Sequence, residues 1–178
     1  MQVLLIYSTV DGHTREIAER IAQTLTGLDC TVETVSLDDG PVPGPGGFDR
    51  VVIGASIRYG RHRDNVVAYI NDHAQVLAAI PGAFFSVNLV ARKPNRREVS
   101  NNPYVKRFLG LIRWQPDEVA VFAGKLDYPR YGFWDRLMIR LIMWMTKGPT
   151  DPDAVVDYTD WEQVEAFARR VPRLRAAG

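Results

Sequence analysis

Hydrophobic positions along this chain fall into two kinds of segment. Short, nearly continuous apolar runs such as Val51–Ile53 and Val119–Phe122 indicate strands that are covered on both faces of a parallel sheet. Between them, apolar residues recur every three or four positions, as in Ile17, Ile21 and Leu25, which is typical of the buried face of a helix. The pattern predicts strands at about 2–7, 30–36, 50–55, 83–88 and 117–123, and helices at about 13–26, 64–78, 101–114 and 160–175.

This alternation of strands and helices predicts a doubly wound α/β fold, built as one domain over residues 1–178. Ligands of such folds bind beyond the carboxyl ends of the parallel strands, so the loops that follow the strands form the candidate site. The single cysteine, Cys30, excludes an intrachain disulfide. The longest apolar run, Leu141–Met145, is far shorter than the ~20 residues of a membrane-spanning helix.

The loop after the first strand has the features of a phosphate site. The segment between that strand and the first helix is Thr9-Val10-Asp11-Gly12-His13-Thr14. Backbone amides and the positive end of the helix converge there, the threonine hydroxyls add donors, and Gly12 permits a close turn. The segment lacks the lysine of triphosphate loops and the glycines of dinucleotide loops. It favours a monophosphate such as that of FMN, although such a stretch can also form only a turn and a helix cap.

Two further loops combine small and polar residues that suit a flat ring. After the third strand comes Gly54-Ala55-Ser56-Ile57-Arg58-Tyr59-Gly60. After the fourth strand comes Ser86-Val87-Asn88-Leu89-Val90-Ala91-Arg92. Tyr59 can stack on a ring, or else pack on a neighbouring helix, and Ser86 and Asn88 can hydrogen-bond a polar ring edge. Together the loops predict one ring-binding site.

Basic residues also cluster after the strand ends, although the net charge is only +1. The three groups are Arg58, Arg61 and Arg63; Arg92, Lys93, Arg96 and Arg97; and Lys125, Arg130, Arg136, Arg140 and Lys147. This placement favours an anionic ligand or surface over the alternative, a solvated charged face. We expect Arg58 and Arg92 to contact the reduced flavin or the carboxylates of a substrate.

An apolar insert at about 125–150 interrupts the α/β alternation before the last helix. Residues 133–145 have the composition of a helix that is apolar almost all round, flanked on one stripe by basic residues. Such a helix must be covered by its own domain, by a second subunit of a homo-oligomer, or by a hydrophobic substrate, a quinone or a membrane. The candidate substrate or membrane contacts are Arg130, Trp134, Arg136, Arg140 and Trp144.

The loops resemble those of flavodoxins, in Thr9-x-x-Gly12-x-Thr14 for the phosphate loop and in Gly54-Ala55-Ser56 with Tyr59-Gly60 for the loop beside the isoalloxazine ring. More closely, the chain resembles the bacterial menaquinone-dependent protoporphyrinogen IX dehydrogenases. The matching stretches are Val51–Gly60, Phe85–Pro94, Tyr128–Tyr131 and Tyr158–Trp161, which together span nearly the whole chain. The tryptophan-rich insert is a departure that leaves these motifs intact.

The resemblance implies FMN as cofactor and a flavodoxin-like five-stranded parallel sheet in the order 2-1-3-4-5. It also implies oxidation of protoporphyrinogen IX to protoporphyrin IX in haem biosynthesis, with electrons passed to menaquinone or another quinone. FMN would carry the redox chemistry while the protein binds and orients the reactants, so no catalytic side chain is predicted. We expect a cytoplasmic protein held peripherally at the inner face of the cell membrane.

The alternative function is that of a flavodoxin-type electron carrier without a substrate of its own. Carriers usually present an acidic face to basic partners, whereas the cofactor edge predicted here is basic. We expect no nucleic-acid partner and no metal, because His13, His62 and His73 have no cysteine or carboxylate partners at metal-site spacing.

Overall fold

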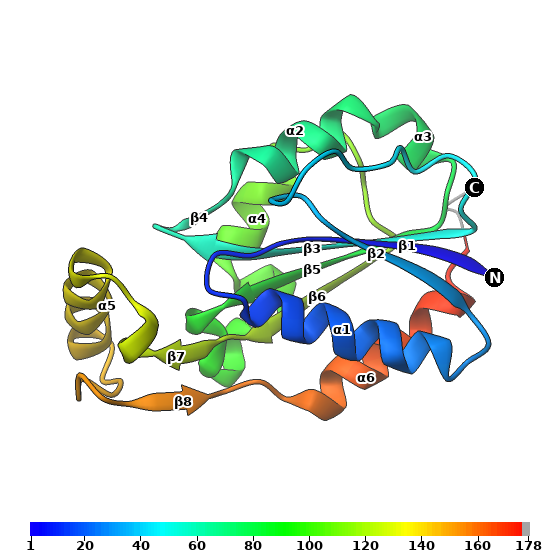
Figure 1. Ribbon diagram of the computed structural model, residues 1–178. Coiled ribbons are helices and arrows are strands. Elements are labelled where there is room, and N and C mark those ends of the chain that lie inside the picture. The colour runs from blue at the N-terminus through cyan, green and yellow to red at the C-terminus, as the bar shows by residue number, and fades with distance from the viewer. Residues whose placement is uncertain (176–178) are drawn as a thin grey trace.

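The computed structural model describes residues 1–175 and contains one main sheet (Figure 1). Its five parallel strands are β1 (Gln2–Ser8), β2 (Thr31–Ser36), β3 (Arg50–Arg58), β5 (Gly82–Asn88) and β6 (Glu118–Ala123). They lie in the order β2-β1-β3-β5-β6, which confirms the predicted flavodoxin-like arrangement. A short strand that the sequence pattern did not predict, β4 (Arg61–His62), pairs antiparallel with the end of β3.

Helices cover both faces of this sheet (Figure 1). On one face lie α1 (His13–Thr26), which has the predicted bounds, and α6 (Trp161–Arg170). On the other lie α2 (Asp64–Asp72), α3 (Ala74–Ala78) and α4 (Pro103–Leu109).

Three helix predictions were wrong in extent, each for a local reason. The segment 64–78 breaks into two helices at His73, whose ring Nδ1 lies 2.9 Å from the Tyr69 carbonyl oxygen. The segment 101–114 is helical only from Pro103, where the Asn102 side chain accepts from the Val105 amide at 3.2 Å, and it ends before Gly110. The last helix ends at Arg170 and continues as a 3₁₀ turn that contains a proline.

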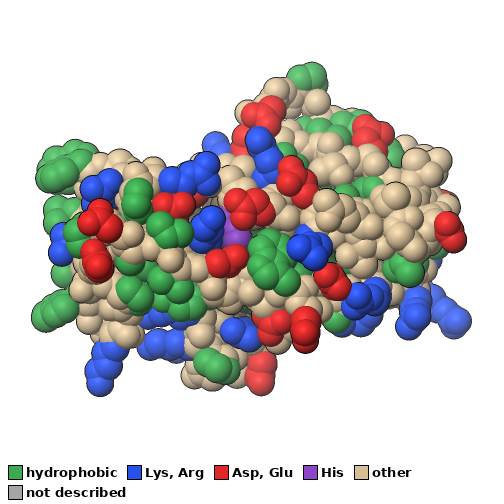
Figure 2. Space-filling model, turned by 60° about the horizontal axis from the view of Figure 1, so that its bottom comes forward, with side chains coloured by type: hydrophobic (Ala, Val, Ile, Leu, Met, Phe, Trp, Pro, Cys, Tyr) green, Lys and Arg blue, Asp and Glu red, His purple; other side chains and the backbone are tan. Residues whose placement is uncertain are grey.

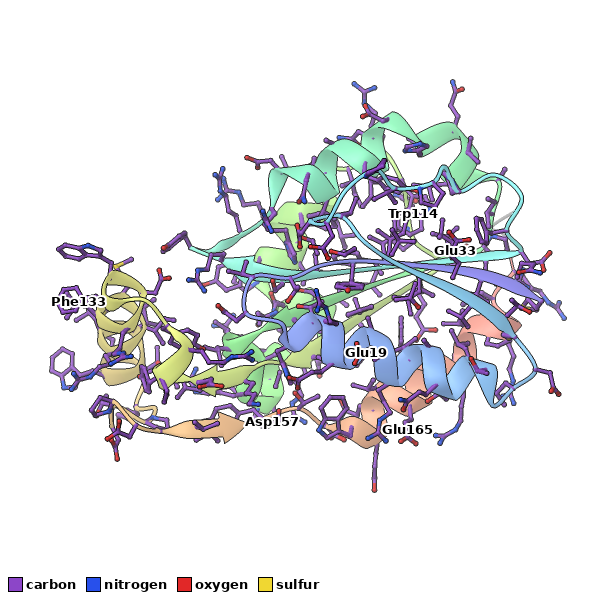
Figure 3. All side chains as sticks on the ribbon, viewed as in Figure 1. Glu19, Glu33, Trp114, Phe133, Asp157 and Glu165 are labelled. Atoms are coloured by element: carbon purple, nitrogen blue, oxygen red, sulfur yellow. The ribbon has the colours of Figure 1, made fainter. Side chains whose placement is uncertain are left out.

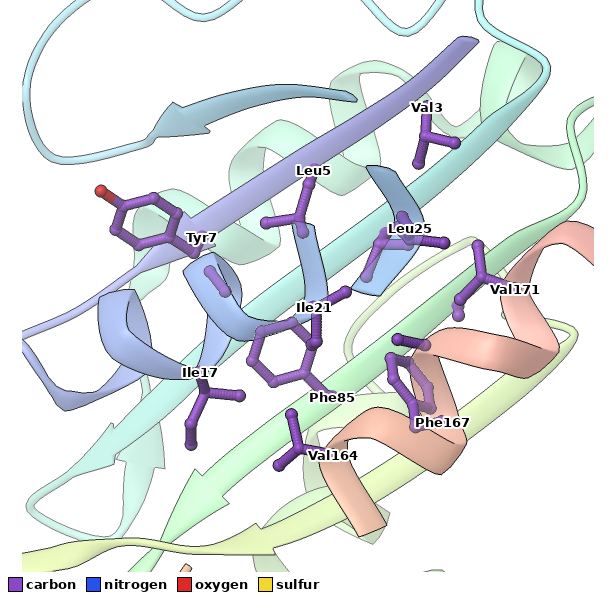
Figure 4. Close-up of a cluster of buried hydrophobic side chains, with 14 of the residues drawn as sticks. Val3, Leu5, Tyr7, Ile17, Ile21, Leu25, Phe85, Val164, Phe167 and Val171 are labelled. Atoms are coloured by element: carbon purple, nitrogen blue, oxygen red, sulfur yellow. The ribbon is translucent and has the colours of Figure 1, made fainter. Parts of the chain in front are cut away.

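The core explains why the strands are apolar at consecutive positions. Leu5 and Phe85 face α1 and α6, where they pack with Ile21 and Phe167 (Figure 4). Leu4, the neighbour of Leu5, faces the opposite layer of helices and is equally buried. Alternate side chains of each strand therefore enter different cores, as the parallel-sheet prediction requires.

The segment between β6 and α6 leaves the main sheet and carries a helix beyond its carboxyl edge (Figure 1). Strands β7 (Lys125–Asp127) and β8 (Val155–Asp157) pair antiparallel and support α5 (Phe133–Met145), which has the predicted bounds. Beneath the helix, a small buried cluster is formed by Leu126, Tyr128, Tyr131 and Met143.

Candidate functional site

A cavity of about 620 Å³ opens at the carboxyl ends of β1, β3 and β5 and is closed on one side by α5. The three loops predicted from the sequence meet there. The predicted residues that line it are Thr9, Asp11, His13, Thr14, Ser56, Ile57, Arg58, Tyr59, Gly60, Val87, Asn88, Leu89 and Arg92. Its volume lies within the ~300–1,000 Å³ typical of cofactor and small-molecule sites.

The first loop has the geometry of an anion site at the start of α1. Gly12 has a φ of 86°, a left-handed conformation that favours glycine, and its amide donates to the Thr9 hydroxyl at 3.0 Å. The Thr14 side chain is 1% exposed, and its hydroxyl has no hydrogen-bond partner within residues 1–175. Because buried polar groups are normally paired, this hydroxyl is available to a ligand at the helix N-terminus.

The second loop offers a similar donor and an aromatic surface. Ser56 also carries a buried hydroxyl without a partner in the described part of the chain. Tyr59 is 69% exposed, so most of its side chain is not packed on a helix as the alternative supposed, although its hydroxyl donates to Asp135 of α5. Its backbone has a φ of 49°, followed by 75° at Gly60, which turns the chain sharply at the cavity mouth.

Some predicted contact residues support the loops from behind and do not line the cavity. Ala55, Ser86 and Ala91 are fully buried. The Ser86 hydroxyl lies 2.9 Å from His62 Nε2 and accepts from the Asn88 side chain at 3.3 Å. Burial lowers the pKa of His62 to about 4, so its ring is neutral at pH 7.

Other predicted residues lie at the edge of the main cavity or outside it. Val10, Gly12 and Arg130 line a second hollow at the phosphate loop, which shares Thr9 and Asp11 with the main cavity. His13 is buried at the start of α1, with its ring nitrogens 3.0 Å from Glu16 Oε2 and 2.6 Å from Thr159 Oγ1. The predicted insert contacts Trp134, Arg136, Arg140 and Trp144 do not line the main cavity.

The two arginines expected to contact ligand are engaged by the protein itself. Arg58 donates to the Asp11 carboxylate at 2.9 Å and also to Asp135 in the first turn of α5. Burial raises the pKa of Asp11, and the Arg58 cation opposes that rise. Arg92 donates to Thr146 Oγ1 at 2.7 Å, just beyond the C-terminal end of α5. Both guanidinium groups thus tie α5 to the ring-flanking loops.

Sequence reasoning missed the part of the cavity that α5 and α4 complete. The missed lining residues include Tyr104, Tyr131, Asp135 and Ile139, whereas Met138 and Ile142 belong to the apolar insert that was expected to bind a hydrophobic reactant. One signal was present, because Asp135 is the only acidic residue in the otherwise apolar or basic segment 133–145. A lone carboxylate in such a helix indicates a specific cationic partner.

The side of α5 that faces away from the cavity is a large apolar surface. Trp134, Leu137, Leu141 and Trp144 lie along it, and each is more than half exposed. We call these four residues the outer face of α5. Hydrophobic side chains gather at this end of the molecule in Figure 2, and Phe133 extends away from the sheet in Figure 3. Within residues 1–175, no helix combines the length and apolarity needed to cross a membrane.

Comparison with known proteins places this geometry in a family. Residues 4–153 match the model of a flavodoxin domain. A curated *Escherichia coli* K12 protein named protoporphyrinogen IX dehydrogenase [quinone] is 47% identical over 174 residues, which cover 98% of this chain and 96% of that protein. The chain belongs to this flavodoxin-like dehydrogenase family. A *Leishmania major* protein of the same name is 44% identical over 168 residues, covering 93% of this chain and 72% of the relative.

Solved structures agree with the fold of this flavodoxin-domain protein. Oxidised flavodoxin 1 from *Bacillus cereus* superposes with a TM-score of 0.57 at 15% identity, covering 97% of this chain and 98% of that one. At this identity the likeness concerns the fold alone. The flavodoxin domain indicates that the protein binds FMN, as predicted. The residues present fit that cofactor, since Thr14 and Ser56 offer unpaired buried hydroxyls where its phosphate and ring are expected.

Proposed function

We propose that this protein oxidises protoporphyrinogen IX to protoporphyrin IX with FMN and passes the electrons to a quinone such as menaquinone. The observation that carries the proposal is a single cavity whose floor is formed by flavodoxin loops and whose wall is an apolar helix. A flavin and a hydrophobic reactant can therefore meet inside it. The names of the curated relatives support the same reaction.

When bound, FMN supplies the transfer of electron pairs, and the chain supplies binding and orientation. The Thr14 hydroxyl and the backbone amides around Gly12 would hold the phosphate. The Ser56 hydroxyl would hold the polar edge of the ring, and the exposed Tyr59 ring would stack against its face. The Arg58–Asp135 pair would keep α5 over the cavity and exclude water from the reactants.

We further propose that the outer face of α5 contacts the inner surface of the cell membrane. Its tryptophans suit a lipid interface, and Arg136 and Arg140 lie beside it, where they can meet lipid phosphates. A helix of this kind lies on a bilayer and does not cross it. The contact would bring the cavity to the depth at which quinones and tetrapyrroles dissolve.

An electron carrier without its own substrate fits the site less well. Lys93, Arg96 and Lys125 make one side of the cavity basic, and the α5 wall makes another side apolar. Neither feature serves a carrier that only docks small redox proteins.

Anaerobic titration tests the proposal directly. The FMN-loaded protein is mixed with protoporphyrinogen IX, and flavin absorbance near its oxidised maximum is followed. We expect bleaching in proportion to substrate, and recovery when a menaquinone analogue is added in vesicles. The same protein without porphyrinogen is the control. Flavin that stays oxidised in the presence of porphyrinogen would refute the proposed activity.

A further inference from the structure

Besides Arg92, which is held by Thr146, three cationic side chains of the cavity have no counterion in the described part of the protein. Lys93, Arg96 and Lys125 line the same cavity as the flavin loops. Among residues 1–175, no carboxylate oxygen lies within 4.0 Å of their charged nitrogens. Arg58, by contrast, is neutralised by two carboxylates of its own chain. The free positive charge of the cavity therefore lies on these three residues and on Arg92, and not on Arg58. Arg92 donates only to neutral oxygens of Leu89 and Thr146, which hold its guanidinium in place.

The loop that carries two of these cations is held in place by polar contacts. Arg96 Nη1 donates to the Asn101 carbonyl at 2.8 Å, and the Arg96 carbonyl accepts from the buried Asn102 side chain at 3.0 Å. The adjacent Arg97 has a structural role, since it pairs with Asp160 at 3.5 Å and donates to the Ala91 carbonyl. The loop is thus positioned in advance, and the remaining N–H groups of Arg96 and the ammonium of Lys93 are free for a ligand.

Another part of the cavity wall is apolar. Met138, Ile139, Ile142 and Met143 of α5 form this wall. A ligand that satisfies both sides must have a broad apolar body and negative charge at one edge. Neither a quinone, which has no charge, nor a small acid, which has no apolar body, would use the whole cavity.

We propose that Lys93, Arg96 and Lys125 bind the carboxylates of an amphipathic dianionic substrate while α5 packs on its apolar body. This inference rests on the proposed function, in which the two propionate groups of protoporphyrinogen IX are those carboxylates. Lysine and arginine side chains hold carboxylates by charge-assisted hydrogen bonds, and the low dielectric beside the α5 wall strengthens them. The acid edge of the macrocycle then lies against the 93–96 loop and fixes which part of the ring faces the flavin.

The test compares protoporphyrin IX with its dimethyl ester, which has the same ring and no carboxylates. Binding to the FMN-loaded protein is measured by quenching of protein fluorescence. The test variant is K93A/R96A, and the control is K106A/R107A, which removes the same charge from exposed positions of α4 outside the cavity. We expect the test variant to bind the diacid at least tenfold more weakly and the diester as wild type does, while the control binds both normally.

A wild-type protein that binds diacid and diester equally, or a test variant that keeps full affinity for the diacid, would overturn the inference. A separate K125A variant, which leaves the 93–96 loop unchanged, should also lose affinity for the diacid and keep its affinity for the diester. A folding defect in the 93–96 loop would not explain that loss. Retained flavin absorbance reports folding in every sample. Oxidation assays separate the two proposals: an inactive wild type refutes the proposed function, whereas an active wild type with an unchanged KM in K93A/R96A refutes only the carboxylate site.

Discussion

The Arg58 guanidinium at the end of β3 donates to the Asp135 carboxylate in the first turn of α5. The Tyr59 hydroxyl donates to the same carboxylate, so two consecutive residues of a ring-flanking loop hold the insert helix. The side chains of Arg58 and Asp135 are 19% and 20% exposed, which leaves the pair only partly screened by water. The position of α5 over the cavity is therefore linked to the conformation of the flavin loop.

Asp135→Asn should loosen α5 without unfolding the sheet. The substitution removes the charge that Arg58 and Tyr59 share, and a charge-assisted hydrogen bond is worth roughly 1.5–3 kcal/mol. Hydrogen exchange measured by mass spectrometry should become about tenfold faster or more in α5 peptides and stay unchanged in α1 peptides. Asp153→Asn, an exposed position in the following loop, is the control. Equal protection of α5 in both variants would contradict the link.

Thr14→Ala should weaken FMN binding by about 1–2 kcal/mol, the value of a hydrogen bond to a charged group. The reason is that the buried Thr14 hydroxyl has no partner within residues 1–175 and lies where the phosphate is expected. Flavin fluorescence titration measures the affinity. Thr26→Ala removes an exposed hydroxyl at the far end of the same helix and should change nothing. Unchanged FMN affinity, or isolation with stoichiometric FAD, would count against the phosphate site.

Acid should destabilise the protein through His62. Its folded pKa of about 4 lies below its ordinary value of 6.5, so the unfolded chain takes up the proton first. The stability from the neutral ring is complete above pH 6.5 and is lost as the pH falls toward 4, at most about 3 kcal/mol in total. Urea unfolding at pH 7.5 and 5 should show this loss in wild type and a smaller loss in His62→Asn. If wild type and His62→Asn lose the same free energy of unfolding between pH 7.5 and 5, His62 is not the cause.

Replacing apolar residues on the outer face of α5 should detach the protein from membranes. We expect L137S/L141S to keep FMN but to bind phosphatidylglycerol vesicles at least tenfold more weakly, because two exposed leucines lose their apolar contact. L28S/L111S removes two exposed leucines elsewhere and should bind normally. Vesicle sedimentation measures both. If L137S/L141S instead converts an oligomer to a monomer and leaves vesicle binding intact, the outer face is a subunit interface.

The pattern of apolar residues was sufficient to predict the main strands, α1 and α5. Short apolar runs indicated the main strands, the period of the buried face indicated α1, and a composition that is apolar almost all round indicated α5. The rule that ligands bind beyond strand ends also predicted that Thr14 and Ser56 share one site, and both line the same cavity. Local pattern and fold class together therefore located the floor of the site.

Features that depend on contacts distant in sequence could not be predicted. Strands β7 and β8 have three residues each, too few for a period, and exist only because they pair with each other. Ser86 was predicted to contact the ring, but its hydroxyl is hydrogen-bonded to His62, which lies 24 positions earlier. The link between Arg58 and Asp135 spans 77 positions, and no spacing rule connects them.

The paired strands β7 and β8 make the insert a separable unit. The chain leaves β6 at Gly124 and returns at Tyr158, whose amide donates to the Gly124 carbonyl at 3.3 Å. The two ends of the excursion are adjacent, so joining them by a short turn would close the parent fold at little entropic cost. A chain that lacked residues 125–157 would thus keep the whole main sheet and the flavin loops, and would lose the apolar wall of the cavity. The excursion adds that wall to a redox fold whose core does not depend on it.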